Sequence, residues 1–143
     1  MRILFFDDER IRYDIFKKRV SLGGDVATTV VYSDSLQDCQ NKLVDHMSGK
    51  TFYDIIHFDH DIQDHTTKEW YNSTELANWF VNNCPKDKIP TMAVIHSVSP
   101  HGSWALYHIF CRLTKCFMSP FRIDTNEYDN ILNIIKGNQN DKV

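Results

Sequence analysis

Apolar, β-prone residues recur along the chain in short runs, and most of these runs end in charged or polar residues. The runs predict five strands, over residues 3–6, 26–32, 53–58, 91–95 and 116–118. Runs such as Ile3-Leu4-Phe5-Phe6 are apolar at consecutive positions rather than at alternate ones. Strands that are covered by helices on both faces need such runs, so the pattern predicts a parallel sheet at the centre of the fold.

Between the predicted strands, apolar residues recur at the spacing of amphipathic helices. The spacing predicts helices over residues 11–20, 36–47, 76–81, 104–113 and 128–135. Strands that alternate with helices predict an α/β fold with right-handed crossovers. We expect a single flavodoxin-like, doubly wound sheet of five parallel strands in the order 2-1-3-4-5. The polar stretch 61–73 is longer than a usual strand-to-helix connection, so we expect it to be a lid or a substrate loop.

Carboxylates follow two of the predicted strands directly. Asp7 and Asp8 come after the first strand, and Asp59 and Asp61 come after the third. The carboxyl ends of parallel strands meet at the edge where ligands bind, so these side chains should converge. Four converging carboxylates repel one another unless a cation or protons compensate, and hard oxygen ligands favour Mg²⁺ or Mn²⁺. The sequence therefore predicts a site for a divalent cation, Mg²⁺ or Mn²⁺; the alternative for Asp7 and Asp8 is that they cap a helix.

Composition and charge narrow the class of protein. The 143 residues suffice for one core, which we expect in a domain over residues 1–136, followed by a polar tail over 137–143. The net charge of −3 gives no reason to expect binding to duplex DNA. The N-terminal residues do not resemble a secretion signal, and no apolar run is long enough to span a membrane. We therefore expect a cytoplasmic protein with reduced cysteines and no membrane association.

The order of the motifs resembles the receiver domains of two-component signalling. Receivers carry paired acids after the first strand, as at Asp7 and Asp8, and a phosphoacceptor aspartate after the third, as at Asp59. They also carry a lysine before a proline after the fifth strand, where this chain has Ser119. Lys115 comes four residues too early to replace that lysine, and this departure argues against phosphorelay signalling.

The same departures resemble a narrower family, the cyclic-phosphate-processing receiver domains. Their signatures read approximately Leu-Asp-Asp-Glu-Arg, Leu-Asp-His-Asp and His-Ser-x-Asn-Pro-x-Gly. The corresponding segments here are Phe-Asp-Asp-Glu-Arg at 6–10, Phe-Asp-His-Asp at 58–61 and His-Ser-Val-Ser-Pro-His-Gly at 96–102. Ser99 stands where the family usually has asparagine. The resemblance implies a receiver-like fold that processes a cyclic phosphate, either on a small cyclic nucleotide or at an RNA end.

Opening a cyclic phosphodiester requires charge neutralisation, an activated water and an acid for the leaving alkoxide. We expect His60 and His96 to act as general base and acid, because imidazole exchanges protons near neutral pH. The phosphate oxygens should contact groups that donate hydrogen bonds, and for this we expect Arg10, Ser97 and the helix-start amides of Gly102 and Ser103.

Each of these roles has a structural alternative. Arg10 has acidic neighbours, Glu9 and Asp14, with which it can pair at the surface, and a serine such as Ser97 often only caps a helix. The remaining histidines fit structural roles better than catalytic ones, with His57 as a hydrogen-bonded core residue and His46, His65, His101 and His108 in helices, loops or turns.

Three functions remain open from the sequence. The first is a metal-dependent phosphodiesterase-type hydrolase that acts on a cyclic phosphate. The second is a module without catalysis that binds or sequesters a cyclic nucleotide, or docks a protein. The third is a phosphoacceptor receiver that uses Asp59.

Overall fold

A computed structural model describes residues 1–22, 27–97, 99–119 and 133. Within these residues, five parallel strands form one sheet in the order β2-β1-β3-β6-β7. The strands are β1 (Arg2–Phe6), β2 (Thr29–Ser33), β3 (Ile55–Asp59), β6 (Met92–His96) and β7 (Lys115–Ser119). Numbered as strands of this sheet alone, the order is 2-1-3-4-5, so the predicted flavodoxin-like sheet is confirmed.

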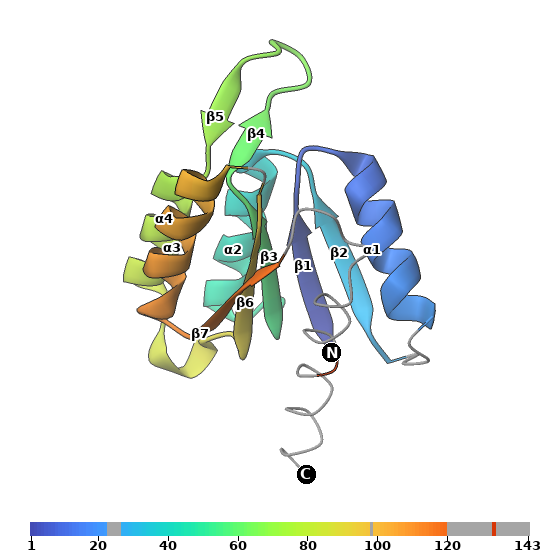
Figure 1. The fold of residues 1–143 in the computed structure, drawn as a ribbon. Coiled ribbons are helices and arrows are strands. Elements are labelled where there is room, and N and C mark those ends of the chain that lie inside the picture. The colour runs from blue at the N-terminus through green and yellow to red at the C-terminus, as the bar shows by residue number, and fades with distance from the viewer. Residues whose placement is uncertain (23–26, 98, 120–132, 134–143) are drawn as a thin grey trace.

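Helices cover both faces of the sheet (Figure 1). One face packs against α1 (Arg10–Leu22), and the other packs against α2 (Leu36–Ser48), α3 (Thr74–Asn83) and α4 (Pro100–Cys111). In β1, Phe5 packs toward α1 and Phe6 toward the opposite layer, and both are fully buried. Successive strand residues point to opposite faces, so a strand buried on both sides has to be apolar at every position.

Some predicted boundaries differ from the structure. The second strand begins at Thr29, whereas 26 was predicted, and residues 23–26 lie outside the described part. The third and fourth strands each extend one residue further than predicted, so that Asp59 and His96 are strand residues. The helix predicted over 128–135 falls outside the described residues apart from 133, and so does the tail. No helix in the described ranges combines the length and the apolar character needed to cross a bilayer.

The stretch 61–73 is a β-hairpin rather than an open loop. Strand β4 (Asp61–Gln63) pairs antiparallel with β5 (Trp70–Asn72), and a short 3-10 helix, η1 (Lys86–Lys88), lies further along the chain. Asp64 organises the turn of the hairpin, because its carboxylate accepts from the amides of Thr66 and Thr67 at 2.8 Å each. Ile62 is buried in the core and anchors the hairpin above the carboxyl edge of the sheet.

The buried His46 on α2 links two segments, and its surroundings predict a pH-dependent stability. Its Nδ1 accepts from the amide of Tyr53 at 3.0 Å, and its Nε2 donates to the carbonyl of Lys88 at 2.6 Å. Burial, followed by the nearby charge of Lys88, holds the pKa of His46 below its usual range. Unfolding therefore releases a histidine that binds protons more readily, and the free energy of unfolding should decrease as the pH falls below about 6.5.

The variant His46→Leu leaves the amide of Tyr53 without its partner, while the carbonyl of Lys88 keeps the weak bond from Sγ of Cys84. An unsatisfied buried group costs about 1–3 kcal/mol, so we expect a loss of about 1–3 kcal/mol at pH 7. Its dependence on pH between 7 and 5 should be weaker than in the parent. Urea unfolding at several pH values measures both effects, with His108→Gln on the exposed surface of α4 as the control. Equal pH dependence in parent and His46→Leu would contradict this role.

Candidate functional site

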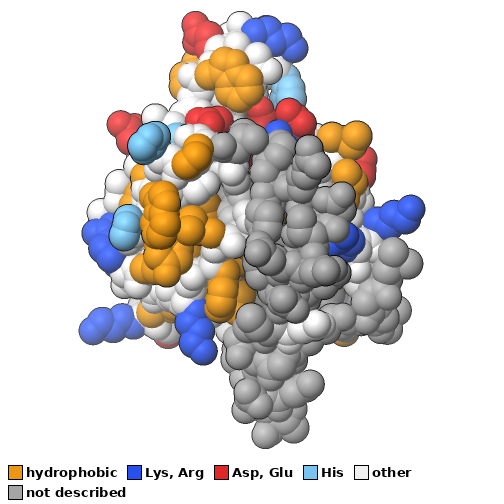
Figure 2. Space-filling view, viewed as in Figure 1, with side chains coloured by type: hydrophobic (Ala, Val, Ile, Leu, Met, Phe, Trp, Pro, Cys, Tyr) orange, Lys and Arg blue, Asp and Glu red, His pale blue; other side chains and the backbone are white. Residues whose placement is uncertain are grey.

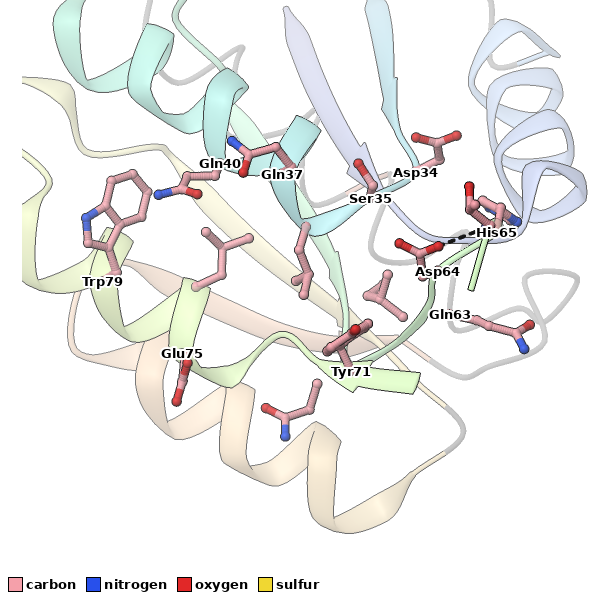
Figure 3. Close-up of a pocket in the computed structure, with 15 residues that line it drawn as sticks. Asp34, Ser35, Gln37, Gln40, Gln63, Asp64, His65, Tyr71, Glu75 and Trp79 are labelled. Carbon is pink, nitrogen blue, oxygen red and sulfur yellow. Dashed lines mark hydrogen bonds between the residues drawn. The ribbon is translucent and has the colours of Figure 1, made fainter. Parts of the chain in front are cut away.

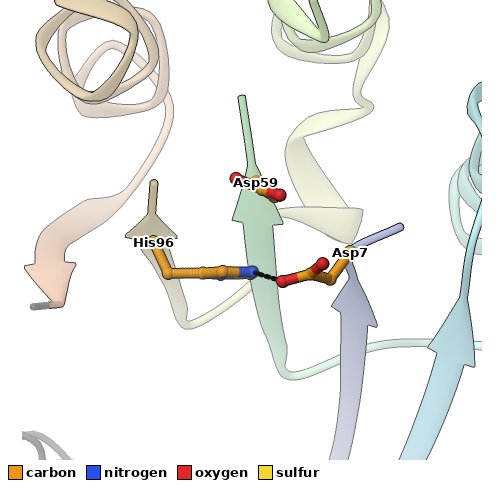
Figure 4. Close-up of side chains that lie close together, drawn as sticks. All are labelled: Asp7, Asp59 and His96. Carbon is orange, nitrogen blue, oxygen red and sulfur yellow. Dashed lines mark hydrogen bonds and ion pairs between the residues drawn. The ribbon is translucent and has the colours of Figure 1, made fainter. Parts of the chain in front are cut away.

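Three neighbouring strands place acids and a histidine at the carboxyl edge of the sheet. Asp7 follows β1 directly, while Asp59 and His96 end β3 and β6 and lie opposite each other in the sheet register. One possible ligand atom from each of these three side chains lies within 4.8 Å of the others (Figure 4). All three residues are buried, as is Asp8, which is 4% exposed. The structure thus brings Asp7, Asp8 and Asp59 together as the sequence predicts.

Arg12 on α1 reaches into this group of acids. Its Nη1 lies 3.2 Å from Oδ2 of Asp7 and 3.4 Å from Oδ2 of Asp59, and its Nη2 lies 3.3 Å from Oε1 of Glu9. The apolar spacing of the helix predicted over 11–20 puts Arg12 on its outer, polar side, but in the structure the side chain turns toward the acids. The unneutralised carboxylates attract a side chain that is long enough to turn back over the first helical turn.

The carboxylates do not ionise equally. Burial alone would raise the pKa of Asp7, but the hydrogen bond and charge of His96, with Arg12, hold this pKa below its usual range. Burial, then the charge of Asp7, raises the pKa of Asp59 to about 9 despite Arg12. Burial also raises the pKa of Asp8. Ionising all three carboxylates together is therefore unfavourable, and either a proton on Asp59 or a cation beside the group would relieve their repulsion.

His96 lies beside Asp7, and both of its ring nitrogens have partners (Figure 4). Its Nε2 is 2.8 Å from Oδ2 of Asp7, and its Nδ1 is 2.5 Å from Nδ1 of His57. His57 is buried, and burial together with His96 holds its pKa well below its usual range. His57 is thus a buried, hydrogen-bonded core residue, as predicted. In the structure the two ring nitrogens of His96 face Asp7 and His57, and its predicted acid–base role stays a prediction.

His60 forms a second pair, nearer to solvent. Its Nδ1 lies 2.7 Å from Oδ1 of Asp61, and its side chain is 15% exposed. A carboxylate oxygen accepts hydrogen bonds, so Nδ1 carries a hydrogen, and in the neutral imidazole Nε2 is then the nitrogen with the lone pair. The ring packs against Gly102 on α4, where a Cβ atom would overlap it.

The sequence matches the model of a known protein family. The model of one family, described as the cyclic-phosphate processing receiver domain, matches residues 2–112, which is more than half of the chain. The chain belongs to this family. No curated protein matches it.

The matched range of this cyclic-phosphate processing receiver domain ends before β7, where receivers of two-component signalling carry their lysine. Ser119 lies opposite His96 in the register, and Lys115 lies opposite Met92. At about 3.3 Å per residue, the backbone of Lys115 is roughly 13 Å from the acidic end of the strand. Lys115 therefore does not replace the missing lysine.

Several predicted phosphate contacts of the receiver domain have other partners. Arg10 is exposed, pairs with Asp14 at 3.3 Å, and lies over the rings of Tyr13 and Tyr32. Because Arg10 begins α1 on its outer side, the basic residue beside the acids is Arg12 instead.

The helix-start amides also have internal partners. The amide of Gly102 donates to Oγ of Ser99, the N-cap residue of α4, at 3.1 Å, and the amide of Ser103 donates to the Ser99 carbonyl at 2.9 Å. Oγ of Ser97 accepts from the amide of Ser99 at 3.1 Å. The cap residue thus satisfies the two amides that were expected to hold phosphate oxygens.

Two cavities flank the hairpin of the receiver domain. The first, the acidic pocket, has a volume of about 370 Å³. Its lining residues are Asp8, Glu9, Arg12, Asp59, Asp61 and Trp70. The second has a volume of about 690 Å³ and lies between the hairpin, α2 and α3 (Figure 3). Its lining mixes polar residues, such as Gln37, Gln40 and Glu75, with apolar ones, such as Leu76 and Trp79. Although the second cavity is larger, the converging acids line the first, which is therefore the candidate site.

Proposed function

We propose that this receiver domain is a metal-dependent hydrolase that opens a cyclic phosphate on a nucleotide or at an RNA end. The observation that carries the proposal is the group of buried carboxylates at the acidic pocket, where burial and the charge of Asp7 raise the pKa of Asp59 to about 9. A purely structural cluster of acids would be expected to have its charge balanced by its own neighbours. The His60–Asp61 pair beside the same pocket adds a group that can transfer protons.

The donor set fits a hard divalent cation. Asp7, Asp8 and Asp59 would hold it through oxygen, with Asp61 on the wall of the pocket and His96 offering a nitrogen. When bound, Mg²⁺ or Mn²⁺ supplies positive charge for the phosphate oxygens and makes a water molecule more acidic.

The chain's own residues supply the remaining steps. Arg12 donates hydrogen bonds to the non-bridging phosphate oxygens, which its position beside the pocket allows. Nε2 of His60 removes a proton from water as the water oxygen bonds to phosphorus. One ring P–O bond then breaks, and the same proton passes to the leaving oxygen, giving a phosphomonoester. His96 is a positioning residue, because it fixes the orientation of Asp7.

The phosphoacceptor alternative has less support. Receivers place a lysine after the fifth strand to neutralise an aspartyl phosphate, whereas here Ser119 lies opposite His96 and Lys115 begins β7 at its far end. Incubation with acetyl phosphate and Mg²⁺ should therefore leave no acid-labile phosphoryl group on Asp59.

The decisive experiment is a substrate panel. Nucleoside 2′,3′-cyclic phosphates, 3′,5′-cyclic nucleotides and short RNAs with cyclic phosphate ends are incubated with Mg²⁺ or Mn²⁺, and the products are separated by chromatography and weighed by mass spectrometry. Hydrolysis adds one water to the substrate. Saturable binding without turnover on the whole panel would favour the module without catalysis, and neither binding nor turnover would reject both.

The contact between Gly102 and His60 gives a specific prediction. In Gly102→Ala the new methyl group overlaps the His60 ring, so the ring has to move away from Asp61. We expect kcat to fall by about 10²-fold, within the range for losing a positioned acid–base group. Circular dichroism should show that the helix is retained, because alanine favours helix more than glycine does. The control is His101→Ala, an exposed neighbour on the same helix; parental turnover in Gly102→Ala would show that the ring position is unimportant.

A further inference from the structure

The β4–β5 hairpin separates the two cavities and presents a different aromatic residue to each. Trp70 lines the acidic pocket, whereas the next residue, Tyr71, lines the larger cavity. Neighbouring strand residues point to opposite faces, which explains the division. Figure 2 shows acidic side chains gathered at the foot of the hairpin, with hydrophobic side chains exposed on the hairpin above them.

The backbone of the hairpin is fixed directly to the acidic residues. The amide of Gln63 donates to Oδ2 of Asp8 at 2.9 Å. Ser73, which follows β5, donates through Oγ to the carbonyl of Asp59 and through its amide to the carbonyl of His60 at 2.8 Å. These bonds hold Trp70 in a defined place above the pocket.

Trp70 leaves a large apolar ring open on one wall of a charged pocket. The residue is 63% exposed, so most of its surface is available to a ligand. Arg12 and the acids line the same pocket and offer the groups that would take a phosphate, Arg12 directly and the acids through a cation. An aromatic ring that lines the same pocket as these groups suits a ligand with a flat, stackable base, because base–aromatic stacking tolerates any base.

The charge of the pocket favours a small ligand over a polymer. Four of the six lining residues, Asp8, Glu9, Asp59 and Asp61, are acidic. One cyclic phosphate carries a single negative charge, whereas an RNA strand would bring further phosphates toward carboxylates that repel them. A volume of about 370 Å³ lies in the range of pockets for small ligands.

We propose that Trp70 stacks on the base of a mononucleoside cyclic phosphate and so selects nucleotides over cyclic phosphates without a base. The kinetic test of this inference rests on the proposed function, because it needs turnover, whereas the binding test does not. Loss of the stacking contact weakens ground-state and transition-state binding alike, so Trp70→Ala should raise KM and leave kcat unchanged.

The kinetic test compares adenosine 2′,3′-cyclic phosphate with glycerol 1,2-cyclic phosphate, which has the same five-membered ring and no base. For the nucleotide, Trp70→Ala should raise KM by about 5- to 150-fold, and Trp70→Phe should restore most of the affinity. The base-free probe should show no change. Two variants serve as matched controls: Tyr71→Ala, on the opposite face of the hairpin, and Trp104→Ala, at a tryptophan of α4 that is 51% exposed.

A binding test works without turnover. The chain has three tryptophans, so replacing Trp79 and Trp104 by phenylalanine leaves Trp70 as the only indole reporter. The nucleotide should quench its fluorescence saturably, and the base-free probe should not. Quenching without turnover would support the stacking site while rejecting the hydrolase.

Three outcomes would overturn the inference and leave the proposed hydrolase intact. The first is turnover with equal KM in the parent and Trp70→Ala, and the second is a rise in KM for the nucleotide in Tyr71→Ala instead. The third is a lower KM for an RNA end than for the mononucleotide. Absence of quenching together with absence of turnover would reject both proposals.

Discussion

Replacing His60 by alanine should lower kcat for cyclic phosphate hydrolysis by about 10²- to 10⁴-fold, the range for a single general acid–base group. His60 combines a partly exposed ring with a Nδ1 that is bonded to Asp61 at 2.7 Å. Substrate affinity should change little, since proton transfer matters in the transition state rather than in the ground state. Steady-state kinetics on the best substrate of the panel measure both parameters.

The control for this variant is His108→Ala, because His108 is exposed on α4 and lies outside the pocket. Thermal unfolding of His60→Ala should match that of the parent within a few degrees. Parental kcat in His60→Ala would remove the residue from the reaction and with it the proposed proton path. A large loss of melting temperature would instead assign His60 a structural role.

Replacing Asp59 by asparagine should have opposite effects on function and on stability. It should remove most of the turnover and most of the rise in melting temperature that Mg²⁺ or Mn²⁺ causes in the parent. That rise corresponds to about 2.7 kcal/mol at a metal concentration of 100 times Kd. In the metal-free protein, the same variant should be more stable by about 1–3 kcal/mol at pH 8, because Arg12 keeps Asp7 and Glu9 as partners.

The direction of the pH dependence follows from the raised pKa of Asp59. The folded protein keeps a proton on this carboxyl up to about pH 9, whereas the unfolded chain releases it near pH 4. The contribution of Asp59 to stability is therefore fully present below pH 4 and is lost as the pH rises toward 9. Metal-free Asp59→Asn should lack this decline. Calorimetry between pH 5 and 9, with and without metal, tests both statements; a parent that shows no metal effect would contradict the metal site.

The sheet and its acidic edge could be predicted from sequence because both depend on local rules. Runs such as Met92-Ala93-Val94-Ile95 are apolar at every position, so a strand made from one is apolar on both faces. Such a strand is stable mainly inside a parallel sheet that helices cover on both sides. Once the strands are parallel, residues that follow them meet at one edge. The convergence of Asp7 and Asp59 could therefore be predicted without knowing which residues they contact.

The details that were missed depend on contacts between distant segments. Arg12 occupies a helical position that reads as exposed, and only the buried carboxylates of Asp7 and Asp59 draw it inward. His96 looks like a rim residue in sequence, but the sheet extends by one residue and His57 lies beside it. A partial signal existed for the hairpin, since Ile62 and the β-prone Trp70 and Tyr71 flank a turn-forming Asp64.

The packing of Gly102 against His60 constrains how this domain can evolve. The two residues lie 42 positions apart in sequence, yet the space for the ring of one exists only because the other has no side chain. Any side chain at position 102 requires a different residue, or a different orientation, at position 60. Mutations at the two sites are therefore not independent, and relatives that change one should change the other. The second and third motifs of the family are thus expected to be inherited, lost or remodelled as one unit.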